Sequence, residues 1–307
     1  MTVIWGGNYS LIKSALADIP PLAFNGVRLA LASVLFLAGI RFTGTAVFRG
    51  SADTRPRPRL SRRDWLGIVA LAIVGQCVYQ LLFISALART SVANSSLIIA
   101  CTPIFVALMT AYGPALSERS KSKGHERVTA WQWAGTLLSA AGIYIVIGSG
   151  ASVSRASMAG DLMMLTAVLC WSASSVGARP LLARHSPLVV TGYSMAIGTV
   201  LYLPFAWSAL GAVAWREVGA YAWWAIVLSA TFALCVAYMI WYTALQRIGN
   251  TRTSIYSNMV PIAAMLVAWL WLGEHVTPLK IGGAAAVLSG VGLTKVQPND
   301  APVPEPA

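Results

Sequence analysis

Long apolar segments, each followed by a polar connection, make up most of this 307-residue chain. Most of them approach the roughly 20 residues that an α-helix needs to cross about 30 Å of hydrocarbon. The pattern predicts an all-α membrane protein with ten transmembrane helices. The predicted spans are residues 2–17, 22–42, 65–87, 92–112, 131–148, 160–178, 188–207, 222–245, 253–271 and 281–296.

The second half of the chain repeats the first, weakly but in the same order. Trp5 and Pro21 match Trp171 and Pro187 at a spacing of 166 residues. Because each copy holds five spans, an odd number, the second copy must enter the bilayer from the opposite side. We therefore predict two inverted five-helix repeats, residues 1–148 and 160–296, as in secondary transporters with alternating access to a midplane site. Later matches, at spacings of 158 and 148, are Ala86-Leu87 with Ala244-Leu245, Pro103 with Pro261, and Gly135 and Gly142 with Gly283 and Gly290.

The two ends of the chain differ from the rest. The first span is short, lacks the basic start of a signal peptide and is interrupted by Asn8 and Lys13, so we expect a span whose beginning has been lost. The proline-rich tail, residues 297–307, is expected to be disordered.

Composition and charge agree with a membrane protein. The chain is 57% hydrophobic and 10% charged, against roughly 25% charged in soluble proteins, and its mean hydropathy is +0.68. With both termini cytoplasmic, 16 of the 22 basic residues lie inside and 4 outside, which satisfies the positive-inside rule. We therefore expect a multi-pass membrane protein with cytoplasmic N- and C-termini. The net charge of +12 indicates topology and contact with anionic lipid, not nucleic acid, because the basic run 55–59 is proline-spaced and lacks aromatic residues.

The residue inventory argues against an enzyme. All ten acidic residues and the three histidines fall in connections or at span ends. The four cysteines lie singly in apolar spans, without metal-ligand spacing, and are expected to be small buried hydrophobic residues. No glycine-rich phosphate loop is present. We therefore predict no catalytic residues, no metal and no cofactor.

Polar residues inside the predicted spans are the candidates for function, because a charge in hydrocarbon costs about 3 kcal/mol or more. Lys13 and Arg28 are the two charged ones, and each also lies near enough to a span end to extend its head group to the interface. Lys13, without an intramembrane acid, is predicted to pair with a substrate carboxylate. The predicted substrate-binding residues are Asn8, Lys13, Gln76, Tyr79, Asn94, Ser95, Trp171, Tyr238, Trp241 and Asn258.

Two prolines stand at corresponding positions inside the fourth and ninth spans. Pro103 and Pro261 each remove a backbone hydrogen bond and bend the helix, which either gives a gate its compliance or makes a static kink. The fifth and tenth spans instead carry small-residue faces that permit close helix approach: Gly135, Ser139 and Gly142, and Gly282, Ala286 and Gly290.

These motifs together resemble the EamA-type members of the drug/metabolite transporter superfamily. The resemblance runs from Trp5 to Leu293 and is carried by Trp5-Gly6-Gly7-Asn8-Tyr9, Pro20-Pro21, Ala86-Leu87 and Trp271-Leu272-Gly273-Glu274. It implies an inner-membrane carrier whose central pocket lies between two five-helix halves, with the fifth and tenth helices away from it. Family members often export amino acids or related metabolites. One departure is Ser117-Glu118, where the second copy has Gly273-Glu274.

We therefore predict a secondary transporter that exports a small polar or amphipathic metabolite, such as an amino acid, by alternating access. Its partners would be this small-molecule substrate and membrane lipid, and a homo-oligomer is compatible with the sequence. Facilitated diffusion, exchange, or coupling through a boundary acid such as Asp161 or Glu274 all stay open. The alternatives are a nucleotide-sugar-type carrier, which would need more basic pocket residues, and a non-transporting membrane scaffold.

Overall fold

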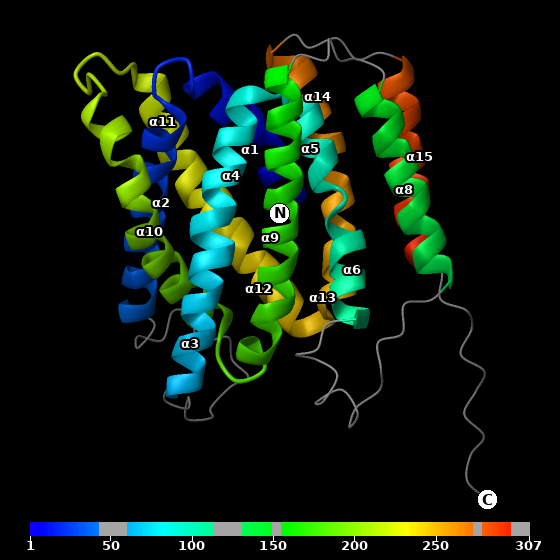
Figure 1. Cartoon of the computed structure of the whole chain (residues 1–307), viewed down its shortest axis with the longest axis horizontal. Helices are drawn as coiled ribbons and strands as arrows, with labels where there is room; N and C mark the ends of the chain where they lie inside the picture. The colour runs from blue at the N-terminus through cyan, green and yellow to red at the C-terminus, as the bar shows by residue number, and fades with distance from the viewer. Residues whose placement is uncertain (43–59, 113–129, 149–154, 273–277, 296–307) are drawn as a thin grey trace, which may run out of the picture.

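The structure, a computed structural model, describes residues 1–42, 60–112, 130–148, 155–272 and 278–295. These residues form helices and contain no β-strand (Figure 1). The first half holds α1 (Thr2–Ala15), α2 (Pro21–Phe42), α3 (Arg62–Leu71), the π-helical η2 (Ala72–Val78), α4 (Tyr79–Arg89), α5 (Val92–Ile99), α6 (Thr102–Tyr112) and α8 (Ala130–Gly148). The second half holds α9 (Arg155–Leu182), α10 (Pro187–Gly211), α11 (Ala220–Leu228), the π-helical η3 (Ser229–Val236), α12 (Ala237–Ile248), α13 (Asn250–Ile255), the 3₁₀-helical η4 (Tyr256–Met259), α14 (Val260–Leu272) and α15 (Pro278–Lys295).

The helices agree with an all-α membrane protein. Six helical stretches of the described residues are long and apolar enough to cross a bilayer. Large apolar side chains also cover the outside of the bundle, among them Val200, Trp207, Trp224 and Leu270. Such a surface is unfavourable in water and suits lipid. The expected tail 297–307 and Glu274 lie outside the described residues.

Corresponding stretches of the two halves run in opposite directions (Figure 1). In that view α3 lies below α4, whereas α11 lies above α12. Likewise α5 lies above α6, whereas α13 lies below α14. The chain therefore rises through the third helical stretch of the first half and descends through the matching stretch of the second.

The two halves touch through residues that occupy corresponding positions. Trp5 and Trp171, 166 residues apart, pack edge to face with ring centroids 5.7 Å apart. Ser33 Oγ and Thr199 Oγ1, also 166 residues apart, share a hydrogen bond of 2.8 Å. Gln80 Nε2 donates to the Tyr238 hydroxyl at 3.1 Å across a spacing of 158 residues. Three pairs of residues at the spacings of the repeat are thus in contact.

Two π-helical segments, which the hydrophobic pattern does not predict, also correspond. A shift of 158 residues carries Ala72–Val78 of η2 onto residues 230–236 of η3. A π-helical turn holds an extra residue, and such turns are frequent at functional sites. Each segment rotates the following turn of its helix relative to the preceding one. Gln80 and Tyr238 lie in those following turns.

The helices around Pro103 and Pro261 are interrupted. Residues 100–101 separate α5 from α6 two residues before Pro103, and η4 ends two residues before Pro261. Proline cannot donate a backbone hydrogen bond. The Thr102 hydroxyl compensates in part, donating to the Ile99 carbonyl at 2.5 Å.

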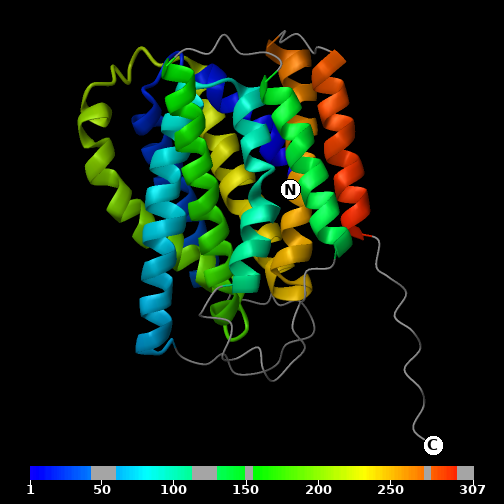
Figure 2. The ribbon, with the colours of Figure 1, turned by 45° about the vertical axis from the view of Figure 1, so that its right-hand side comes forward.

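Helices α8 and α15 pack on one another at one edge of the bundle, and Figures 1 and 2 agree on this position. A Cβ atom at Gly290 would collide with the Gly135 carbonyl and with Ser139. The small residues therefore permit this close contact. The pair lies away from the seam formed by α1, α4, α9 and α12.

Two adjacent glycines in α1 provide a matched test of the packing. A Cβ atom at Gly6 would lie 2.5 Å from Ala263 Cβ and 2.8 Å from the Ala264 nitrogen, whereas one at Gly7 meets no atom within 4 Å. We expect Gly6→Ala to destabilise the protein by about 1–3 kcal/mol through overpacking against α14. Gly7→Ala should be neutral or stabilising, because alanine favours helix. Thermal unfolding of the purified variants in detergent measures both effects, and equal midpoints would contradict the close α1–α14 contact.

Candidate functional site

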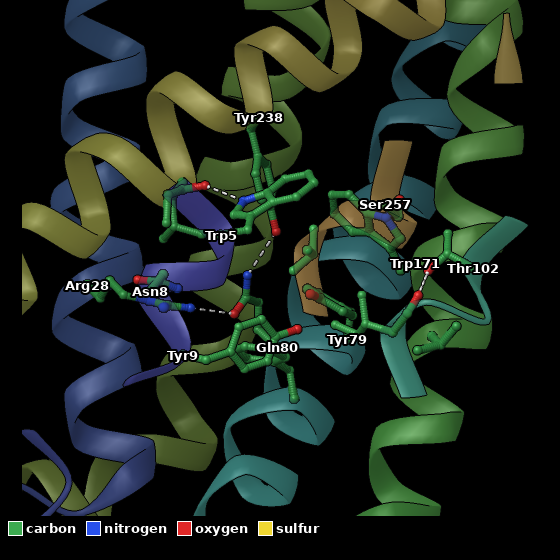
Figure 3. A pocket seen from close by; sticks show the side chains of 16 residues that line it. Trp5, Asn8, Tyr9, Arg28, Tyr79, Gln80, Thr102, Trp171, Tyr238 and Ser257 are labelled. Atoms are coloured by element: carbon green, nitrogen blue, oxygen red, sulfur yellow. Dashed lines mark hydrogen bonds between the residues drawn. The ribbon is translucent and has the colours of Figure 1, made fainter. Parts of the chain in front are cut away.

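A cavity of about 40 Å³ lies at the seam between the two halves (Figure 3). Both halves contribute to its wall, through α1, α2, α4, α5 and α6 on one side and α9, η3, α12, η4 and α14 on the other. In this conformation it is well below the roughly 300–1,000 Å³ of ligand pockets. The lining residues are Trp5, Asn8, Tyr9, Arg28, Tyr79, Gln80, Phe83, Ile99, Thr102, Val168, Trp171, Ala233, Leu234, Tyr238, Ser257 and Val260.

One continuous hydrogen-bond network crosses this pocket. The Ser229 hydroxyl donates to Asn8 Oδ1 at 2.6 Å and accepts from Arg28 Nη1 at 3.0 Å. Arg28 Nη2 donates to Gln80 Oε1 at 3.0 Å, and Gln80 Nε2 donates to the Tyr238 hydroxyl at 3.1 Å. The network joins α1, α2 and α4 to η3 and α12, so polar groups hold the two halves together at the pocket.

Arg28 is the charged residue of this network. Its side chain is buried, with 1% of the residue exposed. No carboxylate among the described residues pairs with it; its partners are the Ser229 hydroxyl and the Gln80 amide oxygen, and its buried Nε has no partner. An arginine stays charged in a protein. The pocket therefore carries a positive charge that neutral groups alone solvate.

Aromatic rings form much of the rest of the pocket lining. Trp171 packs against Tyr79 and Tyr238 with ring centroids 5.2 Å apart in each case. Trp5 joins this cluster and donates its indole N–H to the Ala233 carbonyl at 3.0 Å. The wall thus offers large apolar faces whose polar tips are partly satisfied, an arrangement that suits an amphipathic molecule.

Comparison with known proteins agrees with this architecture. The model of the EamA-like transporter family matches residues 1–119 and 158–296. The chain belongs to the EamA-like transporter family. An uncharacterized transporter of Archaeoglobus fulgidus is 27% identical over 95% of this chain and 93% of its own length. A probable terminal-alkyne amino-acid exporter of Streptantibioticus cattleyicolor is 27% identical over 95% of this chain and 89% of its own length. A crystal structure of a protein with 18% identity has the same fold, with a TM-score of 0.69 over 96% of this chain and 93% of its own.

The pocket of this EamA-like protein contains four of the residues predicted for substrate binding. Asn8, Tyr79, Trp171 and Tyr238 all line it. Trp241 lies directly behind, packed on Trp5 and Trp171, and donates its indole N–H to Ser175 Oγ at 3.2 Å.

The remaining amides and hydroxyls of the predicted set lie outside the pocket lining. Gln76 and Ser95 are fully buried, and none of their side-chain polar atoms has a partner. Asn94 donates to Asp161 Oδ2 at 3.4 Å, near the end of the bundle. Asn258 donates to Ser139 Oγ at 3.3 Å and so contacts α8 instead of the seam. Their sequence positions alone do not separate these roles.

Lys13 also lies outside the pocket lining, and its ammonium group has protein acceptors. It donates to the carbonyl oxygens of Leu87 at 2.7 Å, Thr90 at 2.9 Å and Ala88 at 3.4 Å. These carbonyls end α4, where the helix dipole favours a cation. The pairing of Lys13 with a substrate carboxylate therefore stays a prediction: in this structure Lys13 binds the end of α4, and Arg28 is the cation among the residues that line the pocket.

Sequence reasoning omitted Arg28, Gln80, Ser229 and Trp5 from the predicted site. Lys13 and Arg28 occupy similar positions within their predicted spans, so the sequence does not distinguish their roles. The acceptors of Lys13 are backbone atoms of a helix that is distant in the sequence. The repeat carried an unused signal for two of the others. The partners of Trp171 and Tyr238 at the repeat spacings are Trp5 and Gln80.

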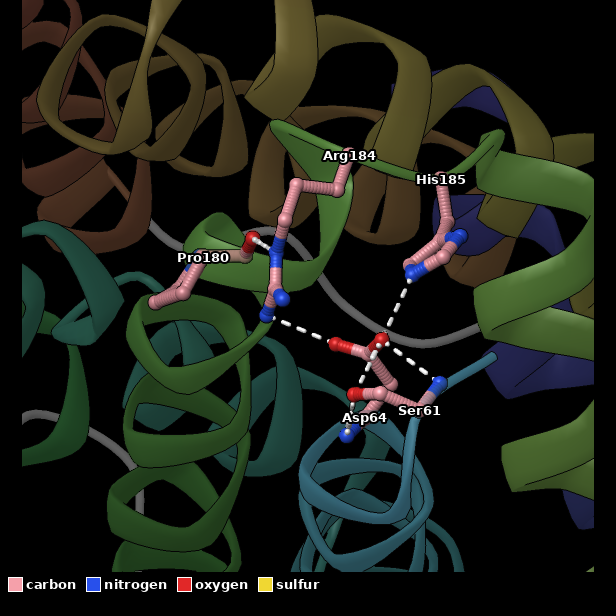
Figure 4. A network of polar contacts seen from close by, with 5 residues as sticks. All are labelled: Ser61, Asp64, Pro180, Arg184 and His185. Atoms are coloured by element: carbon pink, nitrogen blue, oxygen red, sulfur yellow. Dashed lines mark hydrogen bonds and ion pairs between the residues drawn. The ribbon is translucent and has the colours of Figure 1, made fainter. Parts of the chain in front are cut away.

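A polar cluster surrounds Asp64 at the lower end of the bundle (Figure 4). Asp64, at the start of α3, pairs with Arg184 at 2.7 Å and with His185 at 3.1 Å. Its Oδ2 also accepts from the Ser61 hydroxyl and backbone N–H, at 2.8 and 3.0 Å, as part of the N-terminal cap of α3. The cluster ties α3 of the first half to the turn after α9 of the second.

A second polar cluster lies at the upper end of the bundle. Thr90, after α4, donates its hydroxyl to Asp161 Oδ1 at 2.6 Å, and Asn94 binds the other carboxylate oxygen. Lys13 binds the Thr90 carbonyl at 2.9 Å. The two clusters thus bridge the halves on either side of the central pocket. Within the described residues, no three His, Cys, Asp or Glu side chains come together as a metal site.

Two buried serines test the polar network. Ser229→Ala removes the partner of both Asn8 and Arg28, and leaving buried polar groups unpaired costs about 1–3 kcal/mol. Ser172→Ala is the matched control, because the Ser172 hydroxyl is equally buried and has no partner. We expect a lower thermal midpoint for Ser229→Ala and an unchanged or higher one for Ser172→Ala. A loss of the same size in both variants would count against the network.

Proposed function

We propose that this EamA-like protein is a secondary carrier that exports a small polar or amphipathic metabolite, such as an amino acid, by alternating access. In this proposal ten spans form two inverted five-helix repeats around the pocket. The similarity to the probable terminal-alkyne amino-acid exporter of Streptantibioticus cattleyicolor supports the substrate class. Asn8, Tyr79, Trp171 and Tyr238, with Arg28 and Gln80, are the residues we assign to the substrate.

One observation carries the proposal: corresponding residues of the two halves meet beside the pocket. Trp5 contacts Trp171, and Gln80 contacts Tyr238. Equivalent points can touch only near an axis that exchanges the halves. Because the matching helical stretches run in opposite directions, such an axis would lie in the membrane plane, as in inverted-repeat carriers (Figure 1). A pocket on that axis is equally placed to open toward either side.

The two polar clusters are suited to be the closures of such a cycle. The Asp64 cluster would close one side of the pocket and the Asp161 cluster the other. The side of the Asp64 cluster is assigned to the cytoplasm because it is the side predicted to carry the excess of basic residues. Both termini are then cytoplasmic, and the protein resides in the cell membrane. The contacts of both clusters are present in this structure, and the cavity of about 40 Å³ is consistent with a state closed at both ends. Pro103 and Pro261, beside breaks in corresponding helices, are assigned to the bending that opens each side.

The rival functions fit the pocket less well. A nucleotide-sugar carrier needs several cations for a diphosphate, whereas Arg28 is the one basic residue among those lining the pocket in the described chain. A scaffold has no use for a buried network of five polar side chains, which costs stability unless it is fully satisfied.

Transport itself is the first test. Proteoliposomes are loaded with an equimolar mixture of the twenty L-amino acids, and protein-free liposomes are loaded in the same way. The proteoliposomes should lose at least one amino acid faster, as measured by mass spectrometry of the lumen. Ala233→Leu, which fills the pocket wall, should abolish that difference, while Ala220→Leu on an exposed turn of α11 should keep it. Identical retention of all twenty amino acids in protein-containing and protein-free liposomes would reject amino-acid export.

If the Asp64 and Asp161 clusters close opposite sides of the pocket, two conservative variants should open it toward opposite sides of the membrane. In a background where the four cysteines are replaced by alanine, Ser257→Cys reports access to the pocket. Asp64→Asn should raise labelling by a membrane-impermeant maleimide from the cytoplasmic side about fivefold, because roughly 1 kcal/mol shifts a two-state population by that factor. Asp161→Asn should raise labelling from the outer side instead. Equal changes on both sides would show that these carboxylates do not act as closures.

A further inference from the structure

We propose that Arg28 binds the negative charge of the transported molecule, so that the pocket selects monoanionic carboxylates with an apolar remainder over their neutral or cationic analogues. This inference rests on the proposed carrier function and names the chemistry of its pocket. It assigns the role to Arg28 and not to Lys13, the other cation within the predicted spans.

The charge balance of the pocket is the first argument. Arg28 is 1% exposed and lies in the eighth position of α2, where its described partners are one hydroxyl and one amide oxygen. Removing an ion from water costs several kcal/mol, and a neutral acceptor returns only part of this. A buried charge with no counterion is therefore expected to accept one. An anionic ligand supplies that counterion.

The unused hydrogen-bonding capacity of Arg28 is the second argument. Its Nε is buried without a partner, and Nη1 and Nη2, which carry two protons each, bind the Ser229 hydroxyl and Gln80 Oε1 respectively. A carboxylate binds guanidinium through two parallel hydrogen bonds, which no described protein group supplies here. Arg28 thus retains the donors that a carboxylate would use.

The orientation of Arg28 is fixed in advance by the same network. Its acceptors are themselves held, since Ser229 binds Asn8 and Gln80 binds Tyr238. These contacts position the guanidinium at the pocket wall without neutralising it. Little ordering is then left for the ligand to impose, and preorganisation of this kind favours binding.

The aromatic wall accounts for the rest of the ligand. Trp5, Tyr79, Trp171 and Tyr238 line the same pocket as Arg28, and Tyr79 and Trp171 lie on the far side of Gln80 from it (Figure 3). Such rings pack against apolar and aromatic groups and are also attracted to ammonium groups. A molecule with one carboxylate and an apolar body satisfies both walls, and an α-ammonium group is compatible with them. A dianion would leave one charge unpaired.

Lys13 differs from Arg28 in the features that matter. Three backbone carbonyls at the end of α4 accept from its ammonium group, and it is not among the residues that line the pocket. Its charge already has oxygen acceptors with partial negative charge from the helix dipole. Lys13 is therefore the matched control for the loss of a cation from the same part of the protein.

Three phenyl-bearing probes separate the charges of the ligand: L-phenylalanine, 3-phenylpropanoate and L-phenylalaninamide. Binding to the purified full-length protein in detergent is followed by quenching of tryptophan fluorescence, because Trp5 and Trp171 line the pocket. The wild-type protein should bind both carboxylates at least about tenfold more tightly than the amide, the worth of one charged hydrogen bond. Phenylalanine and phenylpropanoate show whether the ammonium group adds to this.

Variants then assign the preference to a residue. Arg28→Gln should abolish the difference between acid and amide, Arg28→Lys should keep part of it because the charge stays while the planar fork is lost, and Lys13→Gln should leave it intact. Circular dichroism and thermal midpoints identify variants that fail to fold, and Arg28→Lys provides the folded comparison.

Several outcomes would overturn the inference. These are a wild-type protein that shows no preference for the acids, an Arg28→Gln protein that keeps the preference, or a Lys13→Gln protein that loses it. Transport with no carboxylate preference would reject this inference and leave the carrier function standing. Carboxylate binding without movement across proteoliposomes would reject the carrier function alone.

Discussion

The cost of placing polar groups in hydrocarbon is the constraint on which this structure depends. A buried polar group without a partner is expensive, so a chain that is 57% hydrophobic gains stability wherever its internal amides, hydroxyls and charges bind one another. Asn8, Ser229, Arg28, Gln80 and Tyr238 do so in a single network. The network lies where the halves meet, and it joins side chains from α1, α2, α4, η3 and α12.

This constraint also separates the two internal cations. Lys13 reaches the free carbonyls that every helix leaves at its C-terminal end, so a structural role satisfies its charge. The acceptors of Arg28 are instead side-chain oxygens, those of Ser229 and Gln80. The same chemical class thus serves stability in one place and, in our proposal, recognition in the other. Burial and the identity of the acceptors make the distinction, whereas depth along the span does not.

The hydrophobic pattern predicted the helical fold well, and the site only in part. Apolar segment length fixes where a helix can cross a bilayer, and all the described helices fall within or around the predicted segments. Asn8, Tyr79, Trp171 and Tyr238 were found because polar and aromatic residues recur on corresponding spans of both halves. Asn94, Asn258 and Lys13 have the same kind of sequence signal but contact other helices. Which neighbour a buried amide meets depends on helix rotation and tilt, which composition does not encode.

The paired π-helical turns bear on the history of the chain. η2 and η3 fall at the same register of the two halves, and each adds a residue that a regular α-helix would not accommodate. If the two halves arose by duplication of one gene segment, a single insertion before that duplication accounts for both turns. The irregular turn would then be older than the two-fold arrangement itself, and the ancestral half-sized protein, pairing with an oppositely oriented copy of itself, would already have carried it.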